Sequence, residues 1–206
     1  MNIFGIRIAA TTAIWLALAA CAPQTEVVKL YDTAKGSRHY DRLLVIDVAS
    51  NADARLQFED LVAGELRRIG AGAVAGHTHT GPKTTLTQAE INDAARKAGA
   101  DGILITHIAS VTMASEREEG RTNVVAECRG GDLADYFLYD YEELKEPDSV
   151  RFAHTVVVVT NLYDAASGDR IWTIQSTCFE KASLEEALAD EAGAIARQLR
   201  IDGLAG

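Results

Sequence analysis

The stretch "VVVVTNLYDAASGDRIWTIQST", residues 156–177, decides the fold of this chain. Two runs rich in β-branched and aromatic residues flank a short polar segment, residues 164–169. Gly168 is placed for a left-handed backbone conformation, which glycine adopts without steric cost. The stretch therefore predicts a β-hairpin with strands over 152–163 and 171–179.

Upstream of the hairpin, predicted strands and helices alternate. Continuous apolar runs at 43–48 and 103–108 are typical of strands in the interior of a sheet. Between them, apolar residues at helical spacing predict a helix over 53–69, followed by a glycine-rich strand over 71–77. The capping box Thr87-Gln88-Ala89-Glu90 then opens a second helix.

Downstream of residue 108, the sequence predicts a strand over 122–128, an irregular acidic segment over 129–149, the hairpin, and a last helix. A second capping box, which begins at Ser183, opens that helix. The fold class is therefore α/β (α+β): a mixed sheet of about five or six strands with helices packed on it. Its order is βαβαβ, then a meander with the hairpin, then a carboxyl-terminal helix.

The amino terminus has the form of an export signal. Arg7 precedes an apolar run over 8–20 that is shorter than the roughly 20 residues a membrane-spanning helix needs. The run ends at Leu18-Ala19-Ala20-Cys21, which resembles the lipobox of bacterial lipoproteins. The resemblance implies that residues 1–20 are removed, that the Cys21 thiol receives a diacylglycerol, and that the new amino terminus is acylated. The alternatives are an ordinary signal cleaved after Ala20 and a short hydrophobic helix.

The residue after the lipobox bears on location. Ala22 follows Cys21, and in lipoproteins an Asp at that position commonly implies retention in the inner membrane. The resemblance thus implies an outer-membrane lipoprotein on the periplasmic face, held by acyl chains that together give stable anchoring. We expect a lipidated tether over 21–41, with a short strand at 27–30, and one periplasmic domain over 42–206.

The charge limits the partners. The chain has 20 Lys and Arg against 30 Asp and Glu, and residues 1–20 contain one Arg and no acid, so the mature net charge is 19 − 30 = −11. This balance disfavours nucleic acid and anionic lipid head groups, because both require clustered cations. We expect no nucleic-acid partner and no cofactor.

Two further cysteines follow Cys21. Cys128 and Cys178 would both lie in an oxidising compartment, which permits a disulfide between them. Alternatively, Cys178 is a small buried residue, because it lies in an apolar strand-like run. The sequence leaves both interpretations open.

The chain contains no Gly-x-Ser-x-Gly elbow, phosphate loop, Gly-x-Gly-x-x-Gly or Cys-x-x-Cys motif. His77 and His79 could bind a metal such as zinc if they lie on a strand, because residues two apart share a face. His107 or His154 would supply a third ligand. Alternatively, His77 and His79 are solvated residues of a glycine-rich loop.

Asp47 stands inside an apolar strand. Burial would raise its pKa, so it could act as a base, or it could bond to a helix amino terminus or a turn. We expect the protein not to be an enzyme.

The segment over 129–149 is the preferred site for binding a partner. It is long for a loop of a compact domain, and long loops are often functional. It carries Tyr136, Tyr139 and Tyr141, and tyrosine is enriched at protein interfaces. The alternative is that residues 136–138 form an edge strand packed on the core.

Two motifs carry a family resemblance: "AARKAGADGILITHI", residues 94–108, and the pattern Tyr-Asp-x-x-x-Gly-x-x-x-Trp at 163–172. Over about 42–200 the chain resembles the small α/β domains of periplasmic lipoproteins related to the curli-secretion lipoprotein, the lipoprotein activator of a penicillin-binding protein, and the amino-terminal domain of TolB. The resemblance implies a fold more than an activity. We expect a non-enzymatic envelope lipoprotein that docks another envelope protein. The alternative is a lipoprotein, a hydrolase included, that binds a metal or small ligand through His77 and His79.

Overall fold

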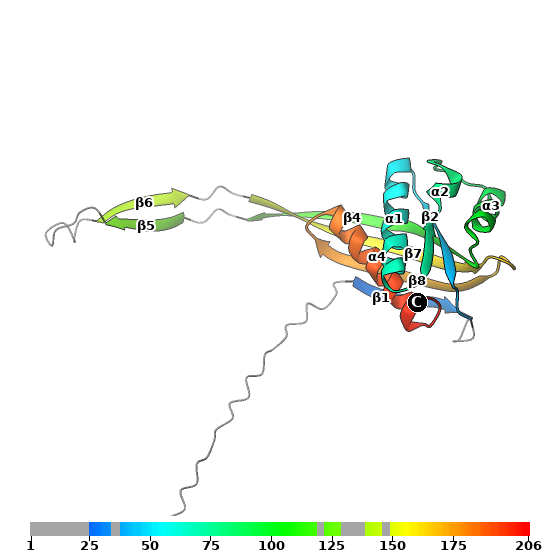
Figure 1. Ribbon diagram of the computed structural model, residues 1–206. Helices are drawn as coiled ribbons and strands as arrows, with labels where there is room; N and C mark the ends of the chain where they lie inside the picture. The colour runs from blue at the N-terminus through cyan, green and yellow to red at the C-terminus, as the bar shows by residue number, and fades with distance from the viewer. Residues whose placement is uncertain (1–24, 34–37, 119–121, 129–138, 146–148) are drawn as a thin grey trace, which may run out of the picture.

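A computed structural model describes residues 25–33, 38–118, 122–128, 139–145 and 149–206. Its main sheet is built from β1 Thr25–Asp32, β2 Arg42–Val48, β3 Gly72–Ala75, β4 Gly102–Glu118, β7 Ser149–Asp164 and β8 Arg170–Lys181. These strands lie in the order β1-β8-β7-β4-β2-β3. β5 Thr122–Cys128 and β6 Tyr139–Lys145 form a second, two-stranded sheet (Figure 1).

The parallel part of the main sheet follows the predicted alternation. β2 pairs in parallel with β3 and with β4, and the connections between them contain α1 Ala52–Arg68, α2 His77–Thr80 and α3 Gln88–Ala98. Leu43, Leu44 and Val45 of β2 are fully buried. The continuous apolar run of β2 is buried because helices cover both faces of this part of the sheet.

The helices begin where the sequence indicates. The side-chain oxygen of Asn51 accepts a hydrogen bond from the backbone N–H of Asp53 at 2.8 Å and so caps α1. Thr87 and Glu90 form both hydrogen bonds of the predicted capping box at α3. Ser183 caps α4 Leu184–Ile201 by accepting from the backbone N–H of Glu186. These local hydrogen bonds satisfy donors that a helix leaves unpaired at its amino terminus.

The helices divide unequally between the two faces of the sheet. α1 and α4 pack side by side on one face and enclose the larger core, which includes Phe58, Trp172 and Ile195 (Figure 1). α3 covers part of the other face with a smaller core. The predicted fold class, a mixed sheet with helices packed on it, is confirmed.

One sequence-based prediction of local structure is extended, and two are corrected. The short strand expected at 27–30 is present but longer: β1 has eight residues and pairs antiparallel with β8. The strand expected over 71–77 ends at Ala75, and His77 begins the helical turn α2. The range expected to be irregular contains β6, so Tyr139 and Tyr141 lie on a strand. Tyr136 and Cys21 lie outside the described residues.

β4 and β7 are longer than the sheet to which they belong. Their pairing continues to Glu118↔Ser149, whereas the pairing of β7 with β8 ends at His154↔Lys181. We call residues 112–118 and 149–155 the arm; seven residues of strand span about 24 Å. Figure 1 shows β4 and β7 extending past α1 and α4. Within the described part of the chain, no helix is long and apolar enough to cross a membrane.

Candidate functional site

Buried polar side chains gather where β2 ends, and Glu59 of α1 is at their centre. One of its oxygens, Oε2, accepts a hydrogen bond from the backbone N–H of His77 at 2.6 Å and lies 3.1 Å from Nδ1 of the same residue. The other, Oε1, accepts from Nε of Arg55 at 2.8 Å and from the backbone N–H of Asp47 at 3.1 Å. Glu59 thus joins α1, the end of β2 and the start of α2.

Arg55 balances the charge of Glu59. Both side chains are fully buried. Arg55 also donates through Nη2 to the hydroxyl of Thr80 at 2.8 Å, and through Nη1 to the backbone carbonyl of Lys83. Because a buried ion pair is tolerated only when its remaining hydrogen-bonding groups are satisfied, these bonds hold the loop after α2 against α1.

Asp47 is a buried acid. It is 2 % exposed, and Oδ1 accepts a hydrogen bond from the Thr106 hydroxyl at 2.8 Å. Burial raises the pKa of Asp47 to about 6; the Thr106 hydrogen bond lowers it, and the negative charge of Glu59 raises it further. A general base needs access to a substrate, and the Asp47 carboxyl group is enclosed. The structure therefore favours a structural role for Asp47.

The histidines do not converge as a metal site requires. His77 faces Glu59 and Asp60, whereas His79 is exposed on the same short helix. In a helical turn, residues two apart do not share a face, so the strand geometry behind the zinc prediction is absent at this point. His154 lies with Nδ1 3.3 Å from the carbonyl oxygen of Lys181. Among the residues that the structure describes, no three His, Cys, Asp or Glu side chains are grouped to hold a metal ion.

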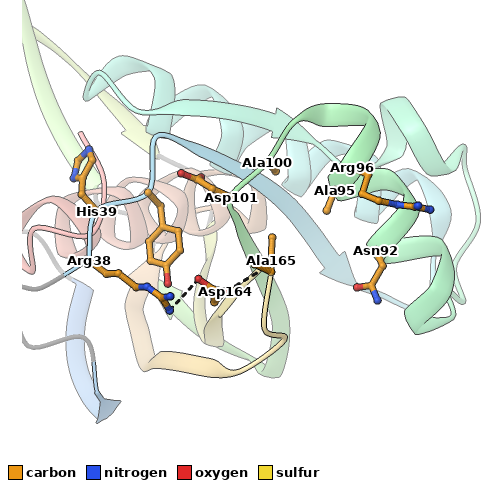
Figure 2. A pocket seen from close by; sticks show the side chains of 11 residues that line it. Arg38, His39, Asn92, Ala95, Arg96, Ala100, Asp101, Asp164 and Ala165 are labelled. Atoms are coloured by element: carbon orange, nitrogen blue, oxygen red, sulfur yellow. Dashed lines mark hydrogen bonds and ion pairs between the residues drawn. The ribbon is translucent and has the colours of Figure 1, made fainter.

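A cavity of about 370 Å³ lies between α3, the loop before β2 and the turn after β7 (Figure 2). In its wall, Nη1 of Arg38 is 2.9 Å from Oδ2 of Asp164. Asp101 accepts hydrogen bonds from the backbone N–H groups of Asp41 and Arg42, each at 2.9 Å. The carboxylates of the cavity therefore hold loops in place.

Tyr40 also lines this cavity, and its buried hydroxyl has no hydrogen-bond partner in the structure. Burial raises the pKa of Tyr40, and the nearby charge of Asp164 raises it further. The tyrosine is therefore neutral near pH 7.

One of the two cysteines of the possible bridge lies in the core. Cys178 is a free, buried thiol in β8, where it faces Thr25 of β1 and Val156 of β7 in register. Cys128 is the last residue of β5, in the other sheet. Burial raises the pKa of the Cys178 thiol. The structure therefore agrees with the alternative, in which Cys178 is a small buried residue.

Glu191 is a buried acid that the sequence analysis missed. It is fully buried on α4, and its carboxyl oxygens and the Ser176 hydroxyl lack hydrogen-bond partners of normal geometry. Burial raises the pKa of Glu191 to about 7, which the nearby Ser176 hydroxyl and Cys178 amide offset in part. A sequence signal existed, because Glu191 stands at helical spacing between the apolar residues Leu188 and Ile195.

The arm and the residue at its base, Val111, expose apolar side chains along one face. Val111, Met113, Val150 and Phe152 are exposed by 48 %, 61 %, 56 % and 46 %. In register, Val111 faces Val156, and Ser115 faces Phe152. Because directly opposite residues share a face, all four lie on the side of the sheet to which the buried Val156 belongs. We call these four residues the apolar stripe.

The stripe lies on the same face of the sheet as α1 and α4, but beyond the part that the described helices cover. The sequence signal was the spacing of two within each pair, 111 with 113 and 150 with 152, which is typical of a strand with one apolar face. Tyr139 and Tyr141, the other predicted contact residues, are paired in register with Cys128 and Ala126 in the β5–β6 sheet.

Comparison with known proteins adds no family assignment. No protein-family model matches the chain, and no curated protein matches it. Among solved structures, the chain is similar to the PelC dodecamer from Paraburkholderia phytofirmans, with 18 % identity, a TM-score of 0.47, and coverage of 88 % of this chain and 99 % of that one. It is also similar to lipoprotein GNA1162 from Neisseria meningitidis, with 12 % identity, a TM-score of 0.40, and coverage of 78 % and 98 %.

Proposed function

We propose that this chain is a lipid-anchored protein of the bacterial outer membrane, facing the periplasm, that binds another envelope protein and catalyses no reaction. The anchor is Cys21, at the end of the lipobox-like sequence. Two buried acids support a non-catalytic role, because their carboxylates are engaged inside the fold: Glu59 accepts from the backbone N–H groups of Asp47 and His77, and Asp47 accepts from the Thr106 hydroxyl.

The observation that carries the proposal is the length of β4 and β7. These strands have 17 and 16 residues, and they run past the sheet in the direction of the chain segment that contains β5 and β6. A two-stranded ribbon without a third strand gains little stability of its own. The length of these two strands is therefore better explained by contact of the ribbon with another molecule than by the stability of the fold.

The test for the protein partner is photocrosslinking in intact cells. A photoreactive phenylalanine analogue replaces Tyr139 or Tyr141 in the full chain, and the control position is Glu185, exposed on α4. We expect one envelope protein to be captured from both β6 positions and not from Glu185. Capture of the same proteins from all three positions, or of none, would contradict docking through β6.

The anchor is tested separately. We expect the mature amino terminus to be a diacylated and N-acylated Cys21, detected by mass spectrometry of the membrane fraction. Cys21→Ala should leave the protein unlipidated. A native chain that begins at an unmodified Cys21 or at Met1 would contradict the anchor and leave the crosslinking result unaffected.

A further inference from the structure

The described chain begins at the end of the sheet from which the arm extends. Thr25, the first residue of β1, faces Cys178, which faces Val156, which in turn faces Val111. These four residues form one row across β1, β8, β7 and β4. Since neighbouring strands are about 4.8 Å apart, the backbone of Thr25 lies about 14 Å from that of Val111, at the base of the arm.

The lipid anchor lies close to that row in the sequence. Cys21 precedes Thr25 by four residues. A fully extended chain spans at most about 3.6 Å per residue, so the Cα atoms of these two residues are at most about 14 Å apart. An acylated Cys21 therefore holds this end of the sheet, and not the opposite end, next to the lipid head groups.

Large exposed apolar side chains gather at the same end. The stripe begins at Val111, in the row of Thr25, and extends about 20 Å along the arm to Val150. Leu184, the first residue of α4, is also exposed, by 40 %. It follows Lys181, which pairs with His154 within the arm. The short link to Cys21 thus allows the apolar stripe and Leu184 to reach the membrane that holds the anchor.

The arm carries charges of both signs. In register, Arg117 faces Val150 of the stripe, whereas Glu116 faces Arg151 on the opposite face of the two strands. The chain as a whole carries a net charge of −10. Such a surface is not suited to a strongly anionic membrane, but it can place apolar side chains at the boundary between head groups and acyl chains of a zwitterionic lipid.

We propose that the apolar stripe lies on the lipid surface of the membrane that holds Cys21, so that the arm contacts the bilayer and does not project freely from it. This inference rests on the proposed lipid anchor. It assigns the apolar stripe to lipid, whereas the proposed protein partner contacts β6. The lipid contact also gives the anchored domain a defined orientation.

The test uses the mature lipidated protein in liposomes made mainly of phosphatidylethanolamine. Met113→Trp places a fluorophore on the stripe. Ile201→Trp is the matched control, because Ile201 is 74 % exposed and lies at the other end of the sheet. Its neighbour Asp202 accepts a hydrogen bond from Trp172, and Trp172 pairs in register with Asp32, the last residue of β1. Trp172 is fully buried and supplies a constant background, which is measured in the parent protein.

With lipids brominated on the acyl chains, we expect the emission of Trp at 113 to fall by about half, as for a group a few ångströms inside the interface. Emission from position 201 should not change. Equal emission with and without bromine at 113 would overturn the lipid contact. Shielding at 113 that depends on protein concentration, without quenching by bromine, would also overturn it, since a second copy would then cover the stripe.

Flotation of the same liposomes separates this inference from the anchor. If the lipidated protein does not float with the liposomes, the anchor itself fails, and the lipid contact fails with it. If it floats but position 113 is not quenched, only the lipid contact fails. Met113→Glu should float as well as the parent, because Cys21 alone holds it in the bilayer.

Discussion

Removing the carboxylate of Glu59 should destabilise the protein strongly, because this side chain accepts hydrogen bonds from Arg55 and from the backbone N–H groups of Asp47 and His77. In Glu59→Ala the guanidinium of Arg55, which is fully buried, loses the partner 2.8 Å from its Nε. Breaking a buried ion pair in this way costs about 3–5 kcal/mol. For a chain of this size, a loss of that order lowers the melting temperature by roughly 6–20 °C.

The assay is equilibrium unfolding in urea, followed by far-ultraviolet circular dichroism. Glu65→Ala is the control, because Glu65 is on the same helix but pairs with Arg68 at the surface; we expect it to cost less than about 1 kcal/mol. Arg55→Met combined with Glu59→Leu should recover much of the loss, because it removes both buried charges. Recovery will be incomplete, since the backbone N–H groups of Asp47 and His77 still lack an acceptor.

A loss of less than about 1 kcal/mol in Glu59→Ala, equal to that of the surface control, would refute the reasoning. It would mean that water or a rearranged side chain reaches Arg55, so that the network does not hold α1, β2 and α2 together. Equal losses in the single and double variants would instead show that the hydrogen bonds to the backbone, and not the ion pair, carry the stability.

Three further predictions concern other buried positions. Because the pKa of Glu191 is raised from 4.5 to about 7 in the fold, stability should fall as the pH rises between these values, and Glu191→Gln should reduce that fall in urea titrations at pH 5 and pH 8. Gly76→Ala should cost about 1–3 kcal/mol in the same assay, because its Cβ would lie 2.2 Å from Cδ1 of Ile46, whereas Gly64→Ala, with nothing within 4 Å, should be neutral or stabilising. Cys178 should resist iodoacetamide in the folded protein and react in urea, as peptide mass spectrometry would show; rapid labelling of the native protein would contradict its burial.

Local patterns predicted the parts of the fold whose signals are local. The apolar run of β2, the caps at Thr87 and Ser183, and the turn with Gly168 at a φ of 76° all depend on neighbouring residues. The strand β1 was underestimated because it is half-exposed and has a mixed composition, so that only its pairing with β8 makes it a strand. The range around β6 was interpreted as a loop because its acidic, mixed composition shows no strand period, and it is a strand through its pairing with β5.

The candidate sites show the same division. His77 and His79 were noticed because histidine pairs are conspicuous in a sequence, but their separation depends on α2, which forms where the backbone N–H of His77 reaches Glu59, 18 residues away. Glu191 was overlooked because a charged residue within an amphipathic helix normally marks the solvent side. Its burial follows from the contact of α4 with β8 and β1.

The sequence by itself determined the class of the fold, the starts of its helices and the hairpin at 164–169, because hydrophobic period, capping and turn chemistry act over a few residues. Only the tertiary structure decided that β4 and β7 outrun the sheet, that Thr25 and Val111 share a row, and that Arg55 and Glu59 are buried together. These features arise from register and burial between segments far apart in the chain, and no local pattern specifies which distant residues will meet.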